Sequence, residues 1–310
     1  MADRFAELAV GNNNWSSVNT WKATTDGATG ASVPTSADNV YVNADSVQGA
    51  GATLTVDAVA SCLDMDWTGA TNTPTLAGAS GVNIYGSLTF IAGMSVTASG
   101  LWDFKSVGAA TITTAGQSVP FRYYFTGAGP FTLQDTLTTT NGDFQLVTGT
   151  LDINGQTINI KSMTLTAAGV RTLTLGAATV NCTAWAYTGT NLTVTANTAT
   201  INISGTGALA GGDVDYNGAD FNLNGSAHTL SGDFTCINLT LPAATTQTIT
   251  LTAGEVIRCT VATLDGDATH LHTFGATGAP RPVLISKTRT DDYVVKVGVD
   301  LEKLAFATWA

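Results

Sequence analysis

Two histidines at alternate positions are the residues of this sequence that are most typical of a metal site. His270 and His272 stand in the segment THLHTF. Alternate side chains of an extended strand lie on the same side, so both imidazole rings would face the same way. Around a threefold axis, three copies would supply six imidazole ligands, which suit a transition metal. A solvent-exposed pair in a polar segment explains the same pattern, and we expect neither a bound metal nor another cofactor.

Three pairs of aspartates have the same alternate spacing. They are Asp64 and Asp66, Asp213 and Asp215, and Asp265 and Asp267. On a strand, the Cα atoms of each pair would lie about 7 Å apart on one face, and the two carboxylates of a glycosidase lie about 5–10 Å apart. An outward acidic edge, or a turn in which Asp accepts backbone N–H groups, accounts for these pairs more simply. We therefore expect no catalytic residue and no enzymatic activity.

The remaining reactive side chains show no catalytic pattern. His228 has no acid, serine or cysteine near it in a nucleophile-like context, and no nucleophile elbow, phosphate-binding loop or dinucleotide fingerprint occurs. The cysteines form no CxxC pair and stand in strand-like segments, which predicts buried free thiols. They are Cys62, Cys182, Cys236 and Cys259.

The charge balance excludes several partners. The formal net charge is −11, and the basic residues form no cluster of the kind that binds phosphates, so we expect no nucleic acid partner.

Thr, Asn and Gly interrupt every apolar run, so we expect no membrane insertion. The segment MADRFAELAV has charged residues where a secretory signal would have its apolar core. We therefore expect the chain to be made in a cytoplasm.

The pattern of residue types along the sequence predicts the secondary-structure elements that must position these residues. The chain of 310 residues contains 54 Thr but only three Glu and six Lys, and Thr172–Gly212 has no charged residue. β-branched residues alternate with small and apolar ones and are interrupted by Gly or Asn every few positions. This pattern favours short strands joined by tight turns over helices.

Two all-β architectures fit short alternating strands. A sandwich or barrel would use hairpins, and Asn141-Gly142, Asn154-Gly155, Asn217-Gly218 and Asn224-Gly225 are suitable turns. A parallel β-helix, or β-solenoid, would stack coils of about 20–25 residues, with Thr and Asn ladders on its outside. We favour the β-solenoid, because the pattern continues for over two hundred residues, whereas a sandwich needs about 100.

Three zones divide the predicted solenoid. Residues 1–50 would form a cap in which Trp15 and Trp21 cover the first coil, residues 51–265 the repetitive body, and residues 266–310 further strands for capping or attachment. The expected core positions are Leu151, Ile153, Ile158, Ile160, Leu173, Leu175, Leu192, Val194, Ile201 and Ile203. The other large aromatic residues could stack on sugars but are expected to fill the core and corners. They are Trp67, Trp102, Trp185, Trp309, Tyr123 and Tyr124.

Several segments, in their order along the chain, resemble one group of tailed-bacteriophage structural proteins. Those proteins begin with a GxGxW…W segment and continue through GGASVPxxxDNVxxxA, and the opening GNNNWSSVNTWKATTDGATGASVPTSADNVYVNADS is similar to this start. TLAGASGVNIYGSLTFIAGM, ITTAGQSVPFRYYFTGAGPFTLQDTLTTT, GTLDINGQTINI, RTLTLGAATVNCTAW and GAPRPVLIS also resemble segments of the group. The chain departs at AELAVGNNN, where the group has an aromatic residue followed by glycine.

The resemblance implies a β-helix-like virion or appendage protein, with no catalytic residues to transfer. We expect a structural protein on the virion exterior, as a tail fibre or spike component or a capsid decoration protein. Its expected partners are copies of itself in a homotrimer, other virion proteins and host-surface polysaccharide. Two alternatives remain at this point: a polysaccharide-degrading tailspike and a bacterial surface adhesin.

Overall fold

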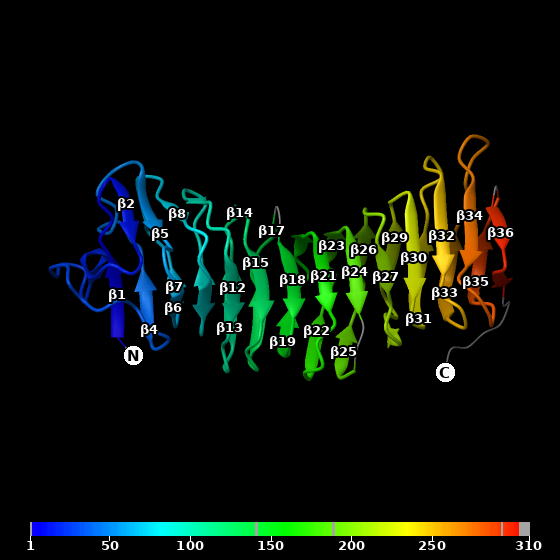
Figure 1. Ribbon diagram of the computed structural model, residues 1–310, viewed down its shortest axis with the longest axis horizontal. Helices are drawn as coiled ribbons and strands as arrows, with labels where there is room; N and C mark the ends of the chain where they lie inside the picture. Colours follow the sequence, from blue (N-terminus) through cyan, green and yellow to red (C-terminus); the bar gives the residue numbers. More distant parts are fainter. Residues whose placement is uncertain (1, 140–141, 188–189, 293, 304–310) are drawn as a thin grey trace. The chain divides into compact units, whose positions relative to one another are not determined.

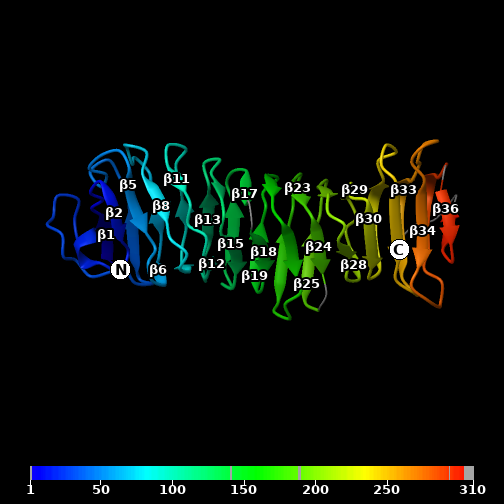
Figure 2. The ribbon, with the colours of Figure 1, turned by 45° about the horizontal axis from the view of Figure 1, so that its top comes forward.

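Short strands separated by tight corners make up most of the chain in the computed structural model. The structure describes residues 2–139, 142–187, 190–292 and 294–303. These form two compact units, Met1–Asp152 and Ile153–Ala310. Within the described ranges the single helix is the 3-10 turn η1, Val18–Thr20, and none could cross a membrane. Each unit is a parallel β-solenoid, which confirms the predicted fold class (Figures 1 and 2).

The strands of the Met1–Asp152 unit belong to four sheets, coloured blue to green in Figure 1. The first contains β1 (Ala2–Ala6), β3 (Trp21–Lys22), β4 (Asp38–Tyr41), β7 (Met65–Asp66), β10 (Leu88–Thr89), β13 (Ala110–Thr113), β16 (Pro130–Leu133) and β19 (Gly149–Asp152). The second contains β2 (Gly11–Asn14), β5 (Ala52–Thr55), β8 (Thr75–Ala77) and β11 (Ser95–Val96). The third contains β6 (Ala60–Cys62), β9 (Val82–Ile84), β12 (Leu101–Phe104), β15 (Arg122–Phe125) and β18 (Asp143–Leu146). The fourth begins with β14 (Ser118–Val119) and β17 (Leu137–Thr139).

The strands of the Ile153–Ala310 unit belong to three sheets. One contains β22 (Arg171–Thr174) and β25 (Leu192–Thr195). Another, which we call the outer Thr/Ala sheet, contains β21 (Ser162–Leu165), β24 (Ala184–Tyr187), β27 (Ala208–Ala210), β30 (Ala227–Ser231), β32 (Gln247–Leu251), β34 (His272–Ala276) and β36 (Val294–Val297). The last contains β20 (Thr157–Asn159), β23 (Thr179–Cys182), β26 (Thr200–Ile203), β29 (Asp220–Leu223), β31 (Phe234–Thr240), β33 (Val256–Thr263), β35 (Val283–Thr290) and β37 (Asp300–Lys303), and β28 (Val214–Asp215) pairs with β31.

Two tryptophans close the first coil, as the sequence predicts. Trp15 and Trp21 are buried, and their rings meet edge to face at 4.9 Å. The Trp21 Nε1–H donates a hydrogen bond of 2.7 Å to the Trp15 carbonyl. Next to them, β3 pairs antiparallel with β1. Because this strand runs against the direction of the coils, it ends the sheet rather than continuing the parallel stack.

Alternating burial along each strand forms the core. Apolar side chains point inward and Thr, Asn or Ser outward, as in β26, where Ile201 and Ile203 are buried between half-buried Thr200 and Asn202. Eight of the ten expected core positions are buried. Leu192 and Val194 are only half-buried, because β25 is the last strand of its sheet among the described residues.

Aromatic side chains fill the core and corners rather than forming an exposed platform. Trp67, Trp102, Trp185 and Tyr123 are buried, and Tyr124 is half-buried. The Trp102 ring stacks on Phe121 with a centroid distance of 4.1 Å and an interplanar angle of 7°. Trp309 lies outside the described residues.

Asparagines at equivalent positions form a ladder on the outside of the second unit. Asn181 donates to Asn159 at 2.7 Å, Asn202 donates to Asn181 at 2.8 Å, and Asn222 donates to Asn202 at 2.8 Å. The amide groups of Asn181 and Asn202 therefore both donate and accept along the stack. Because identical groups repeat once per coil, the ladder fixes the register between neighbouring strands.

We expect the burial pattern to govern the cost of core truncation. Leu173→Ala should lower the free energy of unfolding by about 2–5 kcal/mol, because it leaves a cavity in a fully buried position. The matched change Leu192→Ala should cost clearly less, since Leu192 is already partly in contact with solvent. Urea-induced unfolding measures both values, and equal costs would show that the two side chains do not differ in burial.

Candidate functional site: an acidic pocket in the second unit

Three successive coils of the second unit carry a glycine followed by an acidic residue at the same corner. The pairs are Gly212-Asp213, Gly232-Asp233 and Gly254-Glu255. All three glycines have positive φ values, of 66°, 73° and 81°. A Cβ atom at Gly232 would lie 2.4 Å from the backbone nitrogen of Gly212. Glycine therefore lets the corners at Gly212 and Gly232 stack closely, and it suits the positive φ of all three corners.

The stacked carboxylates are held by backbone amides of the next coil. The amide N–H of Asp233 donates to Asp213 Oδ1 at 3.0 Å, and that of Val256 donates to Asp233 Oδ1 at 2.7 Å. As a result, carboxylate oxygens of Asp213, Asp233 and Glu255 lie within 4.8 Å of one another. Asp213 is exposed and the other two are half-buried.

Two of the stacked acids, Asp213 and Asp233, line a pocket of about 290 Å³ on strands β28, β31 and β33, and Glu255 lies beside them. Its lining residues are Asp213, Val214, Asp215, Asp233, Phe234, Thr235 and Arg258. The Thr235 hydroxyl donates to Asp215 Oδ1. Arg258 is the basic residue of this lining. The pocket thus offers three carboxylates and one guanidinium group to a polar ligand.

The environment raises the pKa of Glu255. Burial is the largest cause, followed by a hydrogen bond with Asp233 and by the negative charges of Asp233 and Asp213. A carboxyl group that holds its proton beside an ionised carboxylate can act as a general acid next to a base. The same oxygens are of the type that hard cations such as Ca²⁺ bind, although Ca²⁺ takes about 6–8 oxygen ligands.

Sequence reasoning identified only part of this pocket. Asp213 and Asp215 were among the expected aspartate pairs, whereas Asp233, Glu255 and Arg258 were not. The signal that could have found them is the repetition of glycine followed by an acid at intervals of about one coil. That signal is weak by itself, because glycine and aspartate are common in turns.

The carboxylates of the other two aspartate pairs accept backbone N–H groups, either within a turn or from the next coil. Asp64 Oδ1 accepts the amide N–H of Ser87 at 2.6 Å, and Asp66 Oδ1 accepts that of Thr68 at 2.8 Å. Asp265 Oδ1 accepts the amide N–H of Asp292 at 2.7 Å. Asp66 thus has the local backbone partner expected of a turn residue, whereas Asp64 and Asp265 link successive coils.

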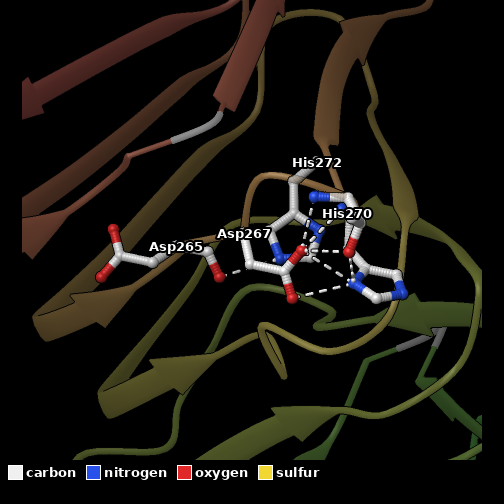
Figure 3. A network of polar contacts seen from close by, with 5 residues as sticks. Asp265, Asp267, His270 and His272 are labelled. Atoms are coloured by element: carbon white, nitrogen blue, oxygen red, sulfur yellow. Dashed lines mark hydrogen bonds and ion pairs between the residues drawn. The ribbon is translucent and has the colours of Figure 1, made fainter.

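His270 and His272 have different environments (Figure 3). His270 precedes β34, is 37% exposed in its side chain, and its Nδ1 lies 2.8 Å from Asp267 Oδ2. Hydrogen bonds from His270 and Thr269 lower the pKa of the Asp267 carboxyl group. His272 is fully buried, and its Nε2 lies 3.1 Å from the Asp265 carbonyl oxygen. The structure therefore does not give the two imidazoles one shared solvent-facing side.

Buried polar side chains, including two histidines, line the inside of the outer Thr/Ala sheet. His228, Gln247 and His272 are at most 2% exposed. His228 Nε2 accepts the amide N–H of Gly225 at 3.1 Å, and Gln247 Nε2 donates to the Gly225 carbonyl at 2.7 Å. Burial lowers the pKa of His228 and of His272, against smaller opposing contributions from nearby backbone groups. Both imidazoles are therefore uncharged in the folded protein near neutral pH.

We expect these two histidines to make the fold sensitive to mild acid. The unfolded chain takes up protons below a pKa of about 6.5, whereas the folded chain resists protonation until a lower pH. Stability should be complete above pH 6.5 and fall as pH drops toward 5.5, by at most about 1.4 kcal/mol per pH unit for each histidine. Urea midpoints between pH 8 and 5.5 measure this slope.

The slope should shrink in the double variant His228→Gln/His272→Gln and persist in His270→Gln, the matched change at the partly exposed histidine. An unchanged slope in the double variant would show that other groups cause the acid sensitivity.

Comparison with known proteins assigns no family to this chain. A scan against protein-family models, a search of curated proteins and a search of solved structures each found no match.

Proposed function

We propose that this chain is a structural protein on the exterior of a tailed-phage particle, as a tail fibre or spike component or a capsid decoration protein. The ordered resemblance from GNNNWSSVNTW to GAPRPVLIS supports the phage assignment. The parallel β-solenoid is compatible with it, because stacked strands satisfy nearly all their backbone hydrogen bonds and suit a durable extracellular scaffold.

The observation that carries this proposal is the uncharged outside of the outer Thr/Ala sheet. Among the described residues, the outward side chains of β21, β24, β27, β30, β32 and β34 include none that is charged, whereas the last strand of the sheet, β36, carries the exposed Lys296. The uncharged outward positions are Ser162, Thr164, Ala184, Ala186, Ala208, Ala210, Ala227, Thr229, Ser231, Thr248, Thr250, Thr273 and Gly275, of which Ala210 is itself buried. Exposed strands normally carry charged residues that prevent side-by-side association. A face without them is suited to permanent contact with another subunit.

Copies of the same chain are the simplest occupant of this face. The side chains are small, so two flat sheets can approach closely, and the repeat of about 4.8 Å along one face matches the repeat along another. A homotrimer, the arrangement that the resemblance implies, would cover all three copies of the face without leaving an open edge. An obligate interface of this kind buries more than about 2,000 Å².

We expect the purified protein to sediment as a trimer at micromolar concentration. Thr248→Lys should dissociate it, because the new ammonium group would be buried in the contact. The matched change Thr193→Lys, at an exposed threonine of β25 on a different sheet, should leave the trimer intact. Analytical ultracentrifugation measures the molecular mass of the unmodified chain and of both variants. A monomer of 31.7 kDa for the unmodified chain would contradict the proposal.

The phage assignment itself is tested on intact particles. Antibodies against the purified protein should label the tail or the capsid exterior in immunogold electron microscopy of particles from a host that expresses the gene. Labelling of the bacterial surface in the absence of particles would instead favour a surface adhesin.

The acidic pocket favours one second candidate, a polysaccharide-degrading tailspike. Glu255, with its raised pKa, lies beside Asp233, and two carboxyl groups about 5–5.5 Å apart are typical of retaining glycosidases. We nevertheless expect the protein to release no reducing ends from host-surface polysaccharide. Release that disappears in Glu255→Gln and Asp233→Asn, but persists in Asp66→Asn, would establish the enzyme instead.

A further inference from the structure

Two of the four cysteines stand directly opposite each other on neighbouring coils. Cys236 of β31 and Cys259 of β33 are register partners in the parallel pair of these strands. Both side chains point into the core and are 4% and 1% exposed. The other two cysteines have an isoleucine in the equivalent place: Cys62 is opposite Ile84, and Cys182 is opposite Ile203. Only the first pair brings two sulfur atoms to one position of the stack among the described strands.

The distance between the strands suits a covalent link. Neighbouring strands lie about 4.8 Å apart, and the Cα atoms of a disulfide are usually about 4.4–6.8 Å apart. The proximity of the Cys259 thiol is the largest cause of the raised pKa of Cys236, followed by burial. The Cys259 thiol also donates a weak hydrogen bond of 3.7 Å to the Ile285 carbonyl, which a disulfide would remove.

We propose that Cys236 and Cys259 are a disulfide-forming site, at which a small-molecule disulfide oxidises the thiols to a bond that joins two successive coils. The inference does not depend on the phage assignment or on the trimer. The bond would lie directly behind the acidic pocket, because the preceding register pair, Thr235 and Arg258, lines that pocket. It would therefore fix the spacing of the two strands that carry these pocket residues.

The reaction is two successive thiol–disulfide exchanges. One cysteine gives up its proton, and its sulfur attacks a sulfur of the small disulfide, which releases one small thiolate and forms a mixed disulfide. The second cysteine gives up its proton and attacks the protein sulfur of that intermediate, which releases the second thiolate. The two thiolates take up the two protons. The protein loses two electrons, and the small disulfide gains them.

Burial of the two thiols determines the conditions under which the disulfide can form. A reducing cytoplasm keeps both thiols free. Outside it, the reaction needs the thiolate form and access to solvent, and both are disfavoured for a buried thiol with a raised pKa. We therefore expect oxidation to be slow at low temperature and to accelerate as the coils of β31, β33 and β35 open locally.

The test treats the full chain with excess 2-hydroxyethyl disulfide at a series of temperatures up to the midpoint of thermal unfolding. Remaining thiols are then blocked with N-ethylmaleimide in denaturant, and peptides are mapped by mass spectrometry without reduction. The expected product joins the peptides of Cys236 and Cys259 and leaves Cys62 and Cys182 alkylated. The melting temperature should rise by about 3–6 °C, as for a closed loop of some twenty residues in a chain of this size.

Two variants check the assignment. Cys236→Ala should lose both the joined peptides and the rise in melting temperature, whereas the matched change Cys182→Ala should keep both. Mapping of the unmodified chain decides the proposal even if a variant fails to fold. Alkylation of all four cysteines at every temperature, or a bond between any other pair, would overturn it.

Discussion

Parallel, in-register pairing between successive coils is the constraint on which the rest of the structure depends. Each strand pairs with the strand one coil later, so residues at equivalent positions lie about 4.8 Å apart along the stack. A favourable side chain at one position is therefore reinforced by the same side chain in the next coil, as in the ladder from Asn159 to Asn222. An unfavourable group would be repeated in the same way, which explains why charged residues are rare on these strands.

The same constraint accounts for the features that could carry function. Stacked glycine corners bring Asp213, Asp233 and Glu255 together although about 20 residues separate successive acids along the chain, and their mutual repulsion contributes to the raised pKa of Glu255. Inward stacking places Cys236 opposite Cys259. Outward stacking produces the uncharged face of the outer Thr/Ala sheet. A polar pocket, an opposed pair of cysteines and a face poor in charge thus arise from one geometric rule.

The architecture could be predicted from the sequence because alternation is a local signal that each strand repeats. Positions such as Ile201 and Ile203 are buried as expected, whereas Leu192 and Val194 depend on whether a neighbouring strand continues their sheet, which alternation does not encode. Arg171 illustrates the same limit: a charged residue is expected outside, yet it is 1% exposed and donates to the carbonyl groups of Gly169, Leu165 and Thr190. The acidic pocket was predicted only in part, because it depends on which corners align from coil to coil.

The most direct test of the account is a cryo-electron microscopy reconstruction of the purified assembly. The account predicts copies of the chain packed against one another through the outer Thr/Ala sheet, with Ala184 and Thr248 buried at the contact. A reconstruction in which this face is open to solvent, while the copies meet through another surface or do not associate, would contradict it. In that case the absence of charged outward side chains on β21, β24, β27, β30, β32 and β34 would require an explanation other than self-association.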